Sequence, residues 1–182
     1  MVVTLGTGIG SGMVRGGKLY TGFGGAGLEA GHIVIHPGGQ LCGCGNRGCW
    51  EQYGSATALI RMAREEMEQS PDSALWQLCG GEKARVDGRI VFQAARQGDA
   101  AARRALDRYL DGLSVGLINI LFPEVICLGG GISAADDDLL LDPLRERFHQ
   151  GCFNKDNPPQ LVKASLGNDA GVVGAALLCD MV

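Results

Sequence analysis

The pattern of apolar and polar positions predicts strands and helices along the whole chain. Short apolar runs near glycine or proline predict buried strands at residues 1–5, 124–128 and 161–164. Apolar residues at helical spacing predict helices over residues 55–67, 87–97, 100–121 and 142–149. We expect a final small-residue helix near residues 167–176 to pack closely on the sheet. A mobile polar loop is predicted at residues 71–85, and an acidic helix start at residues 136–138.

The predicted helix over residues 100–121 carries two glycines on one face. Asp99 caps this helix and Pro123 stops it. Gly112 and Gly116 lie four positions apart, so they share a face that another element can approach closely. Close packing within the core is the favoured interpretation, and a subunit interface is the alternative.

Composition favours one packed lobe and argues against several classes of partner. The chain has 182 residues, of which 46% are apolar, enough for one sizeable core or a large lobe of something bigger. Its 30 glycines cluster at turns, which suggests backbone that approaches ligands closely. The net charge of −4 mixes acids and bases, so we expect no nucleic-acid partner. The apolar runs are too short to span a bilayer and no signal sequence opens the chain, so we expect no membrane partner.

The glycine-rich residues 6–12 follow the first predicted strand and match part of a dinucleotide fingerprint. That fingerprint requires a helix after the glycines, whereas residues 13–20 predict a strand, a Gly-Gly turn and another strand. The glycines therefore join two strands. A hairpin without a ligand and a backbone cradle for phosphate, with Thr7 and Gly8, both remain open.

A second glycine turn, Gly129-Gly130-Gly131, follows the predicted strand at residues 124–128. A strand, a glycine turn and a helix form the arrangement that binds ligands at the carboxyl edge of a parallel sheet. A tight turn without a ligand is the alternative.

Cysteines are concentrated in residues 29–51. Cys42, Cys44 and Cys49 follow a C-x-C-x4-C spacing, and the glycines among them let a short loop bring several thiolates to one point. Three thiolates and one imidazole are a normal tetrahedral set for structural zinc.

The fourth ligand is predicted to be His32, and His36 is its competitor. A disulfide framework or small buried apolar cysteines are the other interpretations of the cluster. The odd count of seven cysteines and the tight Cys-Gly-Cys spacing favour zinc. Free thiolates suit a reduced, cytoplasmic compartment.

The same residues resemble the signature of the ROK family. The chain reads Glu-x-Gly-His, nine residues, then Cys-x-Cys-Gly-x-x-Gly-Cys-x-Glu. That family comprises bacterial sugar kinases, related repressors and uncharacterised reading frames. The resemblance implies an α/β fold: a ribonuclease H-like lobe of the actin/hexokinase type, with a mixed sheet flanked by helices and a zinc-stapled loop.

The resemblance also implies ligands for particular residues. It implies zinc on His32, Cys42, Cys44 and Cys49, and a hexose site built from Glu29, His32 and Glu51. Carboxylates accept hydrogen bonds from sugar hydroxyls, and a metal-bound imidazole presents its other nitrogen in a fixed state. It identifies Thr7 and Gly8 with a phosphate loop, and Gly129, Gly130 and Gly131 with an adenosine-binding loop. Ala30 and Trp50 depart from the family pattern, and we expect both to change the sugar pocket.

The family's catalytic aspartate and first phosphate loop have no counterpart in this chain. Residues 1–182 are therefore expected to be a single domain, the C-terminal lobe of a ROK sugar kinase without its N-terminal lobe. No catalytic residue is assigned, because Asp169 lies within the closing-helix motif and its Asn-Asp-Ala context is judged a coincidence.

Three functions remain open. The first is the sugar- and zinc-binding lobe of a glucokinase-like enzyme that uses ATP and Mg²⁺ when complete and is inactive alone. The second is the effector-binding and dimerisation part of a ROK repressor. The third is a non-catalytic fragment. In each case we expect a homodimer.

Overall fold

A four-stranded mixed sheet lies at the centre of the fold. The computed structural model describes residues 1–120 and 123–179. In the order β2-β1-β5-β6, the strands are β1 (Val2–Leu5), β2 (Ile9–Gly12), β5 (Val125–Gly129) and β6 (Gln160–Lys163). β1 pairs antiparallel with β2 and parallel with β5, and β5 pairs parallel with β6. The three predicted strands are confirmed, and the first glycine-rich segment turns the chain from β1 into β2.

One face of the sheet is buried because side chains along a strand alternate between its two faces. On β1, Val3 and Leu5 are fully buried, whereas Val2 is 42% exposed. The buried face continues through Ile126 and Leu128 on β5. The sheet therefore packs one side against the helices.

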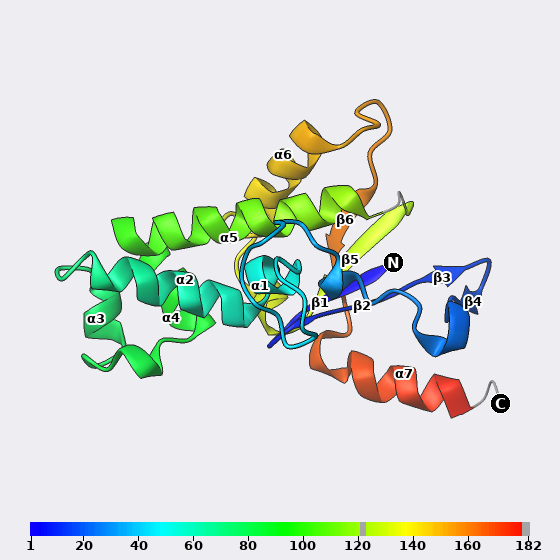
Figure 1. Cartoon of the computed structure of the whole chain (residues 1–182), viewed down its shortest axis with the longest axis horizontal. Helices are drawn as coiled ribbons and strands as arrows, with labels where there is room; N and C mark the ends of the chain where they lie inside the picture. The colour runs from blue at the N-terminus through cyan, green and yellow to red at the C-terminus, as the bar shows by residue number, and fades with distance from the viewer. Residues whose placement is uncertain (121–122, 180–182) are drawn as a thin grey trace.

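Helices are the main secondary structure of the remaining chain (Figure 1). They are α1 (Glu51–Gly54), α2 (Ala56–Glu68), α3 (Ala74–Leu78), α4 (Gly88–Arg96), α5 (Ala100–Asn119), α6 (Leu141–Gly151) and α7 (Ala170–Cys179). Short 3-10 turns are η1 (Phe23–Gly25), η2 (Ala30–His32), η3 (Lys83–Arg85), η4 (Gly131–Ala134) and η5 (Gly167–Asp169). A small hairpin of β3 (Val14–Arg15) and β4 (Lys18–Leu19) confirms the predicted strand, Gly-Gly turn and strand.

Helix α5 is the central helix, and α1, α2, α4 and α6 all pack against it. Its two glycines receive residues of the same chain. A Cβ at Gly112 would lie 2.7 Å from Tyr53 Cβ, and a Cβ at Gly116 would overlap the Trp50 indole. The favoured interpretation, close packing within the core, is therefore confirmed for this face.

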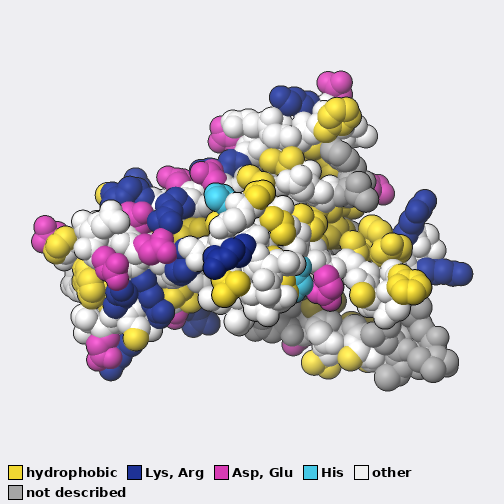
Figure 2. Space-filling view, viewed as in Figure 1, with side chains coloured by type: hydrophobic (Ala, Val, Ile, Leu, Met, Phe, Trp, Pro, Cys, Tyr) yellow, Lys and Arg dark blue, Asp and Glu magenta, His cyan; other side chains and the backbone are white. Residues whose placement is uncertain are grey.

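Charged side chains of both signs tie α2 to α5. Figure 2 shows basic and acidic side chains intermixed over the helical end of the molecule. Glu66 on α2, largely buried, pairs with Arg104 and Arg108 on α5, and Arg108 also reaches Glu65. These pairs fix the two helices across their exposed edge.

The polar stretch at residues 71–85 differs from the prediction of a mobile loop. It contains α3, whose Leu75 is fully buried in the core. The Asp99 carboxylate accepts hydrogen bonds from Ser73 Oγ (3.0 Å) and Ala74 N (2.8 Å) while it caps α5 through Ala102 N (2.8 Å). One carboxylate thus joins the starts of two helices, which a pattern of apolar spacing does not reveal.

The prediction that the acidic residues 136–138 start a helix is wrong. They form a turn before α6, and their carboxylates pair with cations from other elements. Asp136 and Asp138 both pair with Arg96, and Asp137 pairs with Lys163 (2.5 Å). Tertiary ion pairs therefore replace the expected helix-start role of these acids.

The closing helix exists, but it does not pack closely on the sheet. In α7, Val172 is 75% exposed and Leu177 is 59% exposed. The turn η5 directs the helix away from the sheet, and α7 lies apart from the α5 and α6 layer in Figure 1. Within residues 1–120 and 123–179, no helix combines the length and apolar character needed to cross a membrane.

The contact between Gly116 and Trp50 predicts a specific destabilisation. Gly116→Ala should lower the free energy of unfolding by about 2 kcal/mol or more, because the methyl group overlaps a fully buried indole. Urea denaturation measures this change. Gly171→Ala on α7 is the control, since an added Cβ there has nothing within 4 Å. Equal stabilities of the two variants would contradict the packing described here.

Candidate functional site

The cysteine-bearing segment folds as an irregular hairpin that returns on itself before α1. Isolated bridges pair Val34 with Cys49 and Leu41 with Arg47. Inside the turn, Cys42 N donates to Asn46 O (2.8 Å). Gly48 has a positive φ of 86°, and a Cβ there would overlap the His36 carbonyl. Only glycine meets both demands, so Gly48 allows the two arms of this hairpin to close. We call the hairpin, residues 34–49, the zinc loop.

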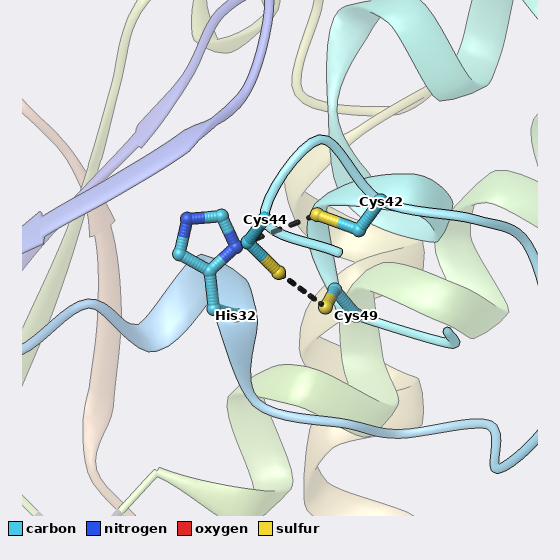
Figure 3. Close-up of side chains that lie close together, drawn as sticks. All are labelled: His32, Cys42, Cys44 and Cys49. Carbon is cyan, nitrogen blue, oxygen red and sulfur yellow. Dashed lines mark hydrogen bonds between the residues drawn. The ribbon is translucent and has the colours of Figure 1, made fainter. Parts of the chain in front are cut away.

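Four side chains converge at the base of the zinc loop. Figure 3 shows His32 from η2 and the three cysteines of the loop pointing toward one another. Cys42 Sγ lies 3.6 Å from His32 Nδ1, and Cys44 Sγ lies 3.6 Å from Cys49 Sγ. All four candidate ligand atoms lie within 4.8 Å of one another. The structure thus brings together the four residues that the sequence predicted as metal ligands.

The spacing of these atoms fits a tetrahedral zinc ion. Zinc–sulfur bonds of about 2.3 Å in a tetrahedron place sulfurs about 3.8 Å apart. The Cys44–Cys49 separation of 3.6 Å is close to that value and far too long for a disulfide. All three are free cysteines. The cluster suggests a zinc site, and no disulfide joins these thiols in the structure.

The environments of the three thiols differ. Burial raises the pKa of the Cys42 thiol to about 12, and a side-chain contact with Glu51 adds to the increase. Burial and the neighbouring Cys44 also raise the pKa of Cys49. Cys44 is exposed, and the backbone N–H of Asn46 together with Cys42 lowers its pKa. Metal binding to this set therefore has to displace protons from the two buried thiols.

His36 is not part of the cluster. Its ring stacks on Tyr53 with a centroid distance of 5.7 Å and an interplanar angle of 19°. The geometry therefore selects His32 over His36 as the fourth member, a choice that spacing alone left open.

Glu51 begins α1 and lies beside the cluster. Its Oε1 atom is 2.9 Å from Cys42 Sγ and 3.9 Å from His32 Nδ1. Its Oε2 atom faces the first glycine turn, since a Cβ on Gly8 would lie 2.7 Å from it. One carboxylate thus lies between the candidate metal ligands and the glycine turn.

Glu29 lies at the start of η2, three residues before His32. Its side chain is exposed, and its carbonyl accepts from His32 N (3.0 Å). The preceding Leu28 has a positive φ of 66°, which is uncommon for a residue with a branched side chain. In the described part of the chain no hydrogen bond or ion pair joins the Glu29 carboxylate to His32 or Glu51, whereas His32 Nδ1 and Glu51 Oε1 lie 3.9 Å apart.

Ser11 and Gly31 hold η2 on the sheet, and neither contact was predicted from the sequence. The Ser11 hydroxyl donates to the Leu28 carbonyl and accepts from Ala30 N (3.3 Å). A Cβ at Gly31 would overlap the Ile9 carbonyl of β2. A lone serine among glycines and the glycine before His32 were the available signals for this contact.

The two predicted nucleotide turns meet at one edge of the sheet. Since β1 and β5 are parallel, their carboxyl ends lead into residues 6–8 and 129–131 on the same side. A Cβ at Gly130, where φ is 84°, would lie 2.6 Å from the Leu5 carbonyl. The start of α2 holds the first turn, because Ala56 N donates to Gly6 O and Thr57 Oγ1 donates to Thr7 O, both at 2.8 Å.

The two departures from the family pattern lie in the core. Trp50 is fully buried and Ala30 is 5% exposed. Because Gly116 leaves room for the indole on α5, Trp50 packs into the interior. The expectation that Ala30 and Trp50 change the sugar pocket stays a prediction.

A cavity of about 640 Å³ lies on the outer side of the zinc loop, away from Glu29, His32 and Glu51. Its lining includes His36, Tyr53, Arg61 and Arg108. Both arginines pair with Glu65, and Arg108 also pairs with Glu66. The cavity and the metal cluster are separate features of the loop.

Comparisons with known proteins agree with this geometry. A model of the ROK family matches residues 1–181. A glucokinase from Thermotoga maritima is 42% identical over 180 residues, which cover 97% of this chain and 56% of that protein. A crystal structure of a ROK family glucokinase from Streptomyces griseus, in complex with glucose and AMPPNP, matches with a TM-score of 0.90 and 38% identity. That match covers 97% of this chain and 59% of the glucokinase.

A regulator shares the same fold. The structure of a ROK family transcriptional regulator, a homolog of the E. coli MLC protein, matches with a TM-score of 0.80 and 27% identity, covering 97% of this chain and 44% of that protein. The chain spans 56% to 59% of the length of the two glucokinases described above. Since the family model extends over nearly every residue, from the first glycine turn through the cysteine cluster to α7, this chain belongs to the ROK family.

Proposed function

We propose that this chain is the sugar- and zinc-binding lobe of a glucokinase-like hexose kinase. The observation that carries the proposal is the position of Glu51, whose carboxylate lies between the His32–cysteine cluster and the Gly8 turn. A sugar bound at this carboxylate would lie next to the turn that we assign to phosphate. The similarity to a glucokinase structure with glucose and AMPPNP supports the same arrangement.

In this proposal Glu29, His32 and Glu51 bind the hexose. Carboxylates accept hydrogen bonds from sugar hydroxyls, and a carboxylate can accept two at once. His32 directs Nδ1 toward Cys42, which leaves its other ring nitrogen for the sugar. Glu51 is only 19% exposed, so its hydrogen bonds to a sugar would form in a partly dry site.

His32, Cys42, Cys44 and Cys49 would hold the zinc ion. With four protein ligands the ion has no open position, so it serves to fix the zinc loop and the residues around it. Glu51 follows Cys49 by two positions. The loop therefore sets the position of the Glu51 backbone, from which the carboxylate extends. The chemistry of phosphate transfer does not pass through this site.

Thr7 and Gly8 would contact the phosphates of ATP, and Gly129, Gly130 and Gly131 would contact its adenosine. Both turns lie at the carboxyl edge of parallel strands, where nucleotides bind in related α/β sheets. Magnesium would accompany ATP in the complete enzyme.

We propose that the isolated chain binds ligands without turning over. It spans 56% of the Thermotoga maritima glucokinase, and the family resemblance assigns the catalytic aspartate to no residue of this chain. Asp169 belongs to η5, just before the exposed helix α7, and we do not assign it a catalytic role. Self-association as a homodimer remains part of the proposal, although Gly112 and Gly116 are occupied within the chain and do not provide its interface.

The regulator match favours a second candidate function, an effector-binding lobe of a ROK repressor. Repressor and kinase would share the zinc and sugar residues. Nucleotide binding separates them: binding of AMPPNP to this chain supports the kinase, and sugar binding without nucleotide binding supports the repressor.

Removal of a metal ligand should release zinc. Cys42→Ser, Cys44→Ser and Cys49→Ser should each weaken zinc binding by tenfold or more, since each deletes one bond to the ion, and zinc per chain after dialysis should fall accordingly. Cys127→Ser is the matched control from outside the cluster. His32→Ala should lose zinc and His36→Ala should retain it. Unchanged zinc in all three cysteine variants would sink the zinc assignment.

Sugar binding should depend on the two carboxylates. Glucose at a hundredfold excess over its Kd should raise the free energy of unfolding of the chain by about 2.7 kcal/mol. The rise in Tm, a thermal shift, measures this stabilisation. Glu29→Ala and Glu51→Ala should abolish the shift while zinc stays bound, and the surface variant Glu146→Ala should keep it. Absence of any shift with glucose or N-acetylmannosamine in the zinc-loaded chain would argue against a sugar-binding lobe.

Release of ADP from ATP, Mg²⁺ and a panel of hexoses tests turnover. We expect none, because the catalytic aspartate has no counterpart. Turnover with glucose would instead show that this chain supplies its own base, and Asp169 would be the first residue to change.

A further inference from the structure

We propose that Gly8 is a positioning residue for the carboxylate of Glu51. Its missing side chain makes the space in which Glu51 Oε2 lies, so the first glycine turn determines where this carboxylate points. This inference deepens the proposed sugar-binding role of Glu51 and rests on it.

Space, and not backbone conformation, is the reason for glycine at position 8. Gly8 is not among the residues with positive φ, so other residues could adopt its backbone conformation. A Cβ there would lie 2.7 Å from Glu51 Oε2 and 3.9 Å from Glu51 Cδ, with no other atom among its neighbours within 4 Å. The first of these distances is shorter than any ordinary carbon–oxygen contact, so an added methyl group would meet the end of the carboxylate and nothing else.

The glycine turn is not free to withdraw from Glu51. Gly6 O accepts from Ala56 N, and Thr7 O accepts from Thr57 Oγ1, both at 2.8 Å. Gly6 N also donates to Gly8 O (3.1 Å) within the turn. These bonds attach the turn to the first residues of α2, so the carboxylate would have to move when a methyl group is added.

Glu51 is held on its other side by the metal-ligand residues. Oε1 lies 2.9 Å from Cys42 Sγ and 3.9 Å from His32 Nδ1. Its backbone starts α1 directly after the buried Trp50. The backbone of Glu51 is fixed and its Oε1 atom contacts the cluster. The position of Oε2 therefore depends on the space that Gly8 leaves by having no side chain. A group placed within a few tenths of an ångström of its working geometry is what a binding site requires.

The consequence is that one turn acts on two ligands. Its backbone is assigned to phosphate, and its lack of a side chain sets the sugar carboxylate. A change at Gly8 should therefore alter sugar affinity even when no nucleotide is present.

Gly8→Ala tests this inference in the zinc-loaded chain. Glucose affinity, measured by calorimetry without nucleotide, should fall about tenfold or more, because a charged hydrogen bond to the sugar is displaced. Zinc content should stay unchanged. Gly12→Ala is the matched control, since it adds the same methyl group to β2 with nothing within 4 Å. The double variant Gly8→Ala/Glu51→Asp should bind glucose better than Gly8→Ala alone, because the shorter side chain clears the methyl group.

A double-mutant cycle tests the contact without any sugar. Gly8→Ala and Glu51→Ala should be non-additive in urea denaturation, since removal of the carboxylate relieves the overlap. Gly12→Ala and Glu51→Ala should be additive. Additive effects at positions 8 and 51, or glucose affinity unchanged in Gly8→Ala, would overturn the inference. If the wild-type chain binds no glucose, the proposed function fails, and the cycle alone decides the contact.

Discussion

The close contact of Trp50 with Gly116 is the constraint on which the functional region depends. The indole is fully buried and occupies the space that a side chain on α5 would otherwise fill. Gly112 makes similar room for Tyr53, so α1 lies against the central helix. This packing fixes the backbone between the zinc loop and α2 within the hydrophobic core. Apolar packing therefore sets the positions of the residues that we propose to bind ligands.

Parallel pairing of β1 with β5 is the second constraint on the candidate site. It brings both glycine turns to one edge of the sheet, and β2 then carries η2 and His32 toward the same region. The zinc loop brings the three cysteines to His32. Glu51 lies where these parts meet, within reach of Cys42 on one side and of Gly8 on the other. Residues that we propose for metal, sugar and phosphate binding are thus neighbours although they come from separate parts of the chain.

Much of this arrangement could be predicted from the sequence, for identifiable reasons. Cysteine spacing located the metal cluster because short loops bring nearby thiols together whatever the surrounding fold. Strand and helix periodicity located the sheet and α5. Spacing did not choose between His32 and His36, because that choice depends on the stacking of His36 on Tyr53. The role of Asp99 in joining α3 to α5 and the exposure of α7 were also missed, since both arise from contacts between distant segments.

Cys49, Trp50 and Glu51 are consecutive, yet each faces a different environment: the metal cluster, the hydrophobic core and the glycine turn. Inserting or deleting a single residue here would rotate all three side chains into the wrong surroundings at once. A change of loop length near Gly38, by contrast, leaves these three residues consecutive and in the same register. The register of Cys49, Trp50 and Glu51 is therefore a strict constraint on this segment.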